Sequence, residues 1–143
     1  ALCGTDISTQ NSSLITSLAQ NIAYTSQITS DINSIWPTTN TLDHNSLDLL
    51  NKKKTFPIVM AFSESDVAQK RQLANLFYQR VVSEEDAQKI TDLLTSLDIK
   101  NKSQKYINEY FDLIIDGFSQ LGLSLSVESD LLAFIKYICL DQQ

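Results

Sequence analysis

Glycine and proline are scarce in this chain, and this scarcity limits the possible folds more than any other feature of the sequence. Glycine occurs only as Gly4, Gly117 and Gly122, and proline only as Pro37 and Pro57, in 143 residues. β-Sandwiches and barrels need a turn roughly every 8–12 residues, and these two residue types usually provide it. The sequence therefore predicts long helices joined by polar connectors.

Apolar residues recur at helical spacings of three and four along most of the chain, which supports the same conclusion. Pro37 should end a long first helix over 6–35, because a residue before proline avoids the α region. Ser83 and Ser126 should cap the starts of two later helices, and Gly122 should follow the end of another. The other expected helices cover 42–50, 57–82 with a break near 63, 84–97 and 103–121. We predict an all-α fold, a single antiparallel bundle of five to six helices with a long N-terminal helix and one domain over 1–143.

The charge balance argues against a nucleic-acid partner, and the length of the apolar runs argues against a membrane span. The chain has 11 basic and 17 acidic residues, a net charge of −6 and a pI near 4.6, so it offers no electrostatic surface for nucleic acid. The longest unbroken apolar run is Phe56–Phe62, far short of the ~20 residues of a membrane span. We also expect Lys52, Lys53 and Lys54, the one basic cluster, to form a solvated loop.

Three observations favour a secreted or extracytoplasmic protein. No Lys or Arg precedes Lys52, so Ser, Thr, Asn and Gln must solvate the first helix where intracellular helices usually use Glu and Lys. Cys3 and Cys139 stand near the two ends of the chain, which suits a single disulfide closing the whole domain. Asn11 and Asn101 begin Asn-x-Ser sequences and are candidate glycosylation sites. The alternatives are compositional drift, chance sequons and two free cysteines.

The residue patterns of common enzymes are missing, so we expect no catalytic function and no cofactor or metal. The sequence contains no Gly-rich phosphate loop, no Gly-x-Ser-x-Gly and no Cys-x-x-Cys. Its single histidine, His44, follows Asp43, but a triad also needs a nucleophile and oxyanion donors. Asp112 and Asp116 share one helical face at i,i+4, a spacing typical of a solvated acidic surface.

The last two helices contain more apolar residues than one packed face requires. Residues 131–140 are apolar around most of the helix circumference, which is typical of a helix buried on several sides. One hypothesis is a binding protein that holds a small apolar ligand, such as a fatty acid or similar lipid, between helices. The contacts would be Phe111, Phe118, Phe134 and Ile135. The alternative is a protein–protein interaction module, such as an inhibitor, an immunity factor or a self-associating domain that forms a homodimer through these helices.

Overall fold

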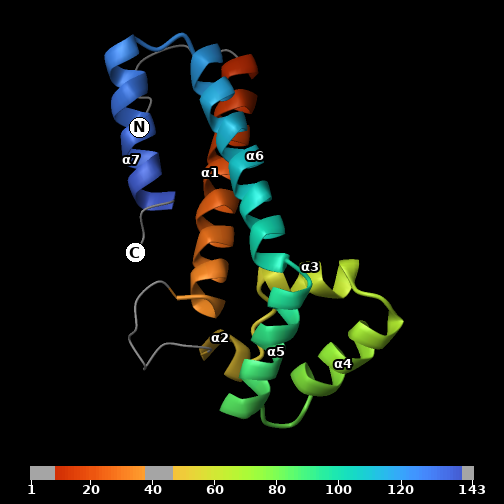
Figure 1. Cartoon of the computed structure of the whole chain (residues 1–143). Coiled ribbons are helices and arrows are strands. Elements are labelled where there is room, and N and C mark those ends of the chain that lie inside the picture. Colours follow the sequence, from red (N-terminus) through yellow and green to blue (C-terminus); the bar gives the residue numbers. More distant parts are fainter. Residues whose placement is uncertain (1–8, 38–46, 140–143) are drawn as a thin grey trace. The chain divides into compact units, whose positions relative to one another are not determined.

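The computed structural model describes residues 9–37 and 47–139, and these residues form seven helices and no strand (Figure 1). The predicted all-α fold is thus confirmed. The helices are α1 (Thr9–Ile35), α2 (Leu47–Leu50), α3 (Phe56–Glu64), α4 (Val67–Phe77), α5 (Glu84–Ser96), α6 (Ile99–Gln120) and α7 (Leu125–Cys139).

The chain divides into two compact units, and the boundaries between them fall inside α1 and α6. The first unit comprises residues 1–27 and 107–142, and the second comprises 28–106 with residue 143. The first therefore contains the N-terminal part of α1, the C-terminal part of α6 and all of α7. The second contains α2 to α5. That 1–143 forms one domain remains a prediction.

Local signals in the sequence place several helix ends correctly. Helix α1 ends at Ile35, shortly before Pro37. Asp66 caps α4 by accepting a hydrogen bond from the backbone N–H of Gln69, so the predicted break falls between α3 and α4. Ser83 caps α5 in the same way through Asp86. Gly122, with a φ of 65°, follows α6 in the left-handed conformation that glycine adopts without strain.

Two predicted helix starts are wrong. Helix α6 begins at Ile99 and not at 103, because Asp98 adopts a φ of 57° and its carbonyl accepts a hydrogen bond from the N–H of Lys102 (3.1 Å). Helix α7 begins at Leu125, so Ser126 lies in its first turn and does not cap it. The N–H of Glu128 already donates to the carbonyl of Ser124 (3.0 Å).

The second unit has its own hydrophobic core, built mainly from α3, α4 and α5 with the C-terminal end of α1. Its fully buried side chains include Leu49, Ile58, Leu73, Phe77, Ile90 and Leu94. Among the described residues, Asp31 is the one buried acidic residue, with 4% of its surface exposed. Its carboxylate accepts a hydrogen bond from the N–H of Phe56 (2.7 Å), which connects α1 to the start of α3.

The lysine cluster lies in a loop in which Lys53 and Lys54 are exposed, as expected, but two of its ammonium groups also have partners. The ammonium of Lys53 lies 3.0 Å from Asp48 and 3.6 Å from Asp31, and the hydrogen bond to Asp48 raises the pKa of Lys53. Lys52 donates to the carbonyls of Gln79 and Arg80, just after α4. Two of the three lysines therefore contact other segments of the second unit.

Candidate functional site

The first unit is a group of three helices around a small core. Figure 1 shows α1, α6 and α7 running side by side, and the buried residues Leu18, Ile114, Phe118, Ile135 and Cys139 come from all three. Gly117 lets α1 and α6 approach closely, because a Cβ atom there would lie 2.5 Å from Cδ2 of Leu18. This core sets which side of α7 faces the protein and which side faces solvent.

Three of the four predicted ligand contacts meet in this core, but the fourth does not. Phe118 and Ile135 are 6% and 4% exposed and belong to the same buried cluster, and the half-buried Phe111 packs against it. Phe134 follows Ile135 directly, yet its side chain is 60% exposed. The structure therefore brings three of the four residues together in one cluster and leaves the side chain of Phe134 mostly exposed.

Phe134 belongs instead to an exposed apolar surface along α7. Val127, Leu131, Phe134 and Ile138 follow one another at spacings of four, three and four, which places them on one side of the helix. We call these four residues the α7 stripe. Leu131 and Ile138 are half-buried against the core, whereas Val127 and Phe134 are 45% and 60% exposed. Tyr137, beside the stripe, is 68% exposed.

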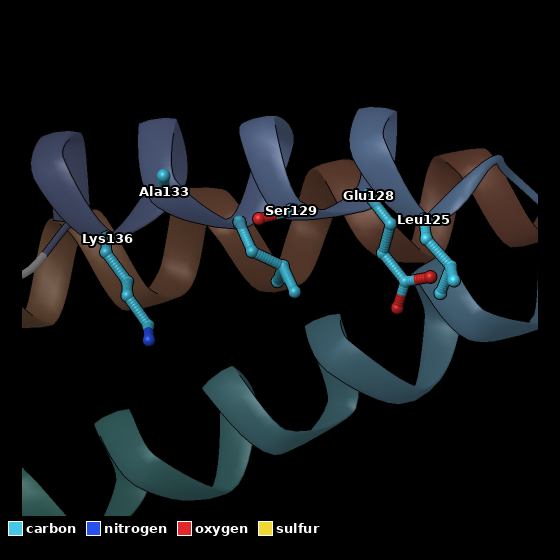
Figure 2. Close-up of a pocket in the computed structure, with 6 residues that line it drawn as sticks. Leu125, Glu128, Ser129, Ala133 and Lys136 are labelled. Carbon is cyan, nitrogen blue, oxygen red and sulfur yellow. The ribbon is translucent and has the colours of Figure 1, made fainter.

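A groove follows a different side of α7, with a volume of about 400 Å³ (Figure 2). Its lining residues are Leu125, Glu128, Ser129, Leu132, Ala133 and Lys136. Figure 2 shows the side chains of Glu128 and Lys136 pointing from α7 towards α6. There, the hydroxyl of Ser119 donates to Glu128 (3.3 Å), and the ammonium of Lys136 lies 5.9 Å from the ring centroid of Phe111.

Acidic residues dominate the charge of the first unit. Its described residues include five acidic side chains (Glu109, Asp112, Asp116, Glu128 and Asp130) and a single basic one, Lys136. Asp112 and Asp116 are exposed on α6, in agreement with the acidic face predicted from their spacing. Residues 9–27 of α1 carry no charged side chain at all. The described residues of the second unit, in contrast, include nine acidic and ten basic side chains.

The uncharged N-terminal part of helix α1, over residues 9–27, satisfies several of its hydroxyl groups internally. Thr16, Ser17 and Thr25 each donate a hydrogen bond to the carbonyl four residues earlier, at 2.9, 3.1 and 2.8 Å. Such bonds let Ser and Thr side chains occupy a helix without leaving a polar group unpaired. The predicted glycosylation site Asn11 is exposed on this helix.

The second candidate glycosylation site lies within a helix and not in a loop. Asn101 is exposed on α6, and its side-chain amide donates to the carboxylate of Asp98 (2.7 Å). Ser103, the third residue of that sequon, is fully buried and contacts the sulfur of Met60. Glycosylation at either asparagine remains a prediction.

Cys139 is a free thiol in the structure, and no disulfide is seen among the described residues. Cys3 and His44 both lie outside the described residues. The sulfur of Cys139 lies 3.8 Å from the carbonyl oxygen of Ile22, and burial raises the pKa of the thiol. Cys139 thus behaves as a small core residue of the first unit.

A smaller hollow of about 180 Å³ lies in the second unit, over α3. Phe56, Val59, Met60 and Tyr106 provide most of its apolar lining, and Glu64 at its edge already forms an ion pair with Lys102. Within residues 9–37 and 47–139, no group of three or more His, Cys, Asp or Glu side chains is placed to hold a metal ion. No helix in these ranges is long and apolar enough to cross a membrane.

Sequence reasoning did not find the α7 stripe, although the signal was present. The excess of apolar residues in 131–140 indicated that α7 could not bury all of them, but it did not indicate which would stay exposed. Comparisons with models of protein families, with curated proteins and with solved structures find no match to this chain.

Proposed function

We propose that this protein is a non-catalytic binding protein that docks a partner protein through the α7 stripe. The observation that carries the proposal is the exposure of Phe134 next to Val127 and Tyr137 on one helix. Contiguous apolar surface that a folded chain leaves in water usually marks an interaction site. The spacing of the stripe is also that of an amphipathic helix packing against a second helix.

The energetics favour a partner on this surface over a ligand inside the core. Burying a Phe side chain completely contributes about 1.5–3 kcal/mol, so the exposed part of Phe134 alone leaves about 1–2 kcal/mol available to a partner. Phe118 and Ile135, in contrast, already contact other side chains of the core. A ligand between the helices would first have to displace them.

A selection with a matched control tests this function. A displayed library of helical peptides is selected against the protein, and the binders are retested on Phe134→Asp and Val67→Asp. Val67 is 66% exposed in the first turn of α4, so Val67→Asp makes a similar apolar-to-acid change on a helix of the second unit. We expect Phe134→Asp to weaken the binders at least tenfold and Val67→Asp to leave them unchanged. Binders that are insensitive to Phe134→Asp would contradict the proposal.

A specific observation supports a second candidate function, the binding of a fatty acid in the α7 groove. The groove has the volume of a small-molecule site, about 300–1,000 Å³. Leu125 and Leu132 could contact an acyl chain, and the ammonium of Lys136 could pair with the carboxylate. A fluorescent fatty-acid probe should then bind saturably at one site and weaken several-fold in Lys136→Gln. Unsaturable binding, or no effect of Lys136→Gln, would remove this candidate.

We also propose a secreted or extracytoplasmic location. The absence of charge over residues 9–27 supports it, since packing and internal hydrogen bonds replace the ion pairs common on intracellular helices. Antibody detection in cell and medium fractions of the natural source tests this location. Recovery in the cytoplasmic fraction alone would contradict it.

A further inference from the structure

We infer that the partner bound by the α7 stripe is a basic amphipathic helix. This inference rests on the proposed function and adds the chemistry of the partner. The first unit, which carries the stripe, has five acidic side chains and one lysine among its described residues. The negative charge of this unit would attract a cationic partner during approach and in the bound complex, and it would repel an anionic partner.

The positions of the charges around α7 lead to the same conclusion. At 100° per residue, Asp130 lies about 40° from Phe134 around the helix axis, directly beside the stripe. Lys136 lies about 160° from Phe134, on the opposite side, where its ammonium is over the ring of Phe111. A helix on the stripe would therefore meet the carboxylate of Asp130 but not the one basic group of this unit.

The same charges argue against a second copy of this chain as the occupant. Two copies that meet through their stripes would bring together two first units whose described residues each include five acidic side chains and one lysine. Each copy would also present Asp130 beside the interface, and Lys136, the basic residue among the described residues of the first unit, lies on the opposite side of α7 from the stripe. Like charges in such a position act against association. A basic partner removes this repulsion and gains an attraction.

A pair of peptides that differ only in charge tests the inference. Both are stapled helices with leucine at spacings of four, three and four, and one carries lysine at every flanking position where the other carries glutamate. We expect the lysine peptide to bind at least tenfold more tightly at low salt. The difference should nearly vanish at 1 M salt, where the screening length is only about 3 Å.

Two variants connect the result to the named residues. Asp130→Lys should reduce the preference for the lysine peptide by about threefold to tenfold, as expected for one exposed charge changed in sign. Phe134→Asp should abolish the binding of both peptides, and Val67→Asp should change neither. The full chain is used throughout, and circular dichroism confirms that each variant is folded.

The possible outcomes separate this inference from the proposed function. Suppose that the two peptides bind equally, or that the glutamate peptide binds more tightly, and that Phe134→Asp abolishes this binding. That result would overturn the basic partner but leave the α7 stripe as a docking surface. Failure of both peptides to bind, or binding that Phe134→Asp does not change, would overturn the docking surface as well. A dimer at micromolar concentration that dissociates in Phe134→Asp would assign the stripe to a second copy.

Discussion

Replacing Gly117 by alanine should destabilise the protein, although alanine is the better helix former. In an exposed helix this change would stabilise by about 1 kcal/mol through helix propensity. At Gly117, however, the new Cβ would lie 2.5 Å from Cδ2 and 2.9 Å from Cγ of Leu18. Leu18 is buried, so it must shift against its neighbours, and such overpacking costs about 1–3 kcal/mol. We expect a net loss of about 1 kcal/mol.

A double-mutant cycle with Leu18→Ala tests the cause of this loss. Leu18→Ala alone should cost about 2–5 kcal/mol, because it removes a buried side chain and leaves a cavity. In that background the clash is gone, so Gly117→Ala should stabilise by about 1 kcal/mol. The effect of Gly117→Ala thus changes sign, and the coupling between the two sites is about 2 kcal/mol.

Urea denaturation followed by circular dichroism measures each free energy of unfolding in the cycle. Gly122→Ala is the control. Its Cβ would meet nothing within 4 Å, but its φ of 65° makes alanine unfavourable, so it should destabilise equally in both backgrounds. If Gly117→Ala stabilises the protein to the same extent with and without Leu18→Ala, the close approach of α1 and α6 is refuted.

Three further predictions follow from burial. Phe118→Asp should unfold the first unit or lower the free energy of unfolding by more than about 4 kcal/mol, because Phe118 is buried. Phe134→Asp should change the free energy of unfolding by less than about 0.5 kcal/mol, because Phe134 is exposed. If thermal melts show similar losses of stability for the two variants, the exposure of Phe134 is contradicted. Asp31→Ala should lower the free energy of unfolding by about 2–3 kcal/mol, because it leaves the N–H of Phe56 without its acceptor. Asp31→Asn keeps an oxygen that can accept this hydrogen bond, so it should lower the free energy of unfolding by less in the same urea assay. The raised pKa of Cys139 keeps its thiol protonated and unreactive at neutral pH, so a thiol reagent should label this residue slowly in the native protein. Labelling should become faster at alkaline pH, and it should be immediate once the protein is unfolded. Failure to release any thiol on unfolding without reductant would instead indicate the Cys3–Cys139 disulfide.

The sequence was most informative where a local interaction decides the structure. The ends of helices at Pro37, Ser83 and Gly122 depend on the chemistry of single residues, and these ends were predicted correctly. The all-α fold follows from the same local signals repeated along the chain. Ser126 misled the prediction because Ser124, two residues earlier, directly precedes α7, and its carbonyl accepts the hydrogen bond from the N–H of Glu128.

The candidate site was less predictable because distant residues decide it. Phe134 and Ile135 are adjacent and both apolar, yet one is 60% exposed and the other 4%. Only the positions of α1 and α6 select the side of α7 that becomes core. Lys53 is a similar case, because its partner Asp31 is 22 residues away in sequence. Such pairings leave no periodic signal in a single sequence.

The most direct test of the docking surface is a nuclear magnetic resonance titration of the isotope-labelled full chain with the lysine peptide. If the peptide packs on the α7 stripe, the backbone signals of residues 127–138 should shift in proportion to occupancy. Those of α3, α4 and α5, in the second unit, should stay unchanged. Shifts that concentrate in α3 to α5, or binding that leaves residues 127–138 unperturbed, would contradict the assignment of α7 as the docking surface.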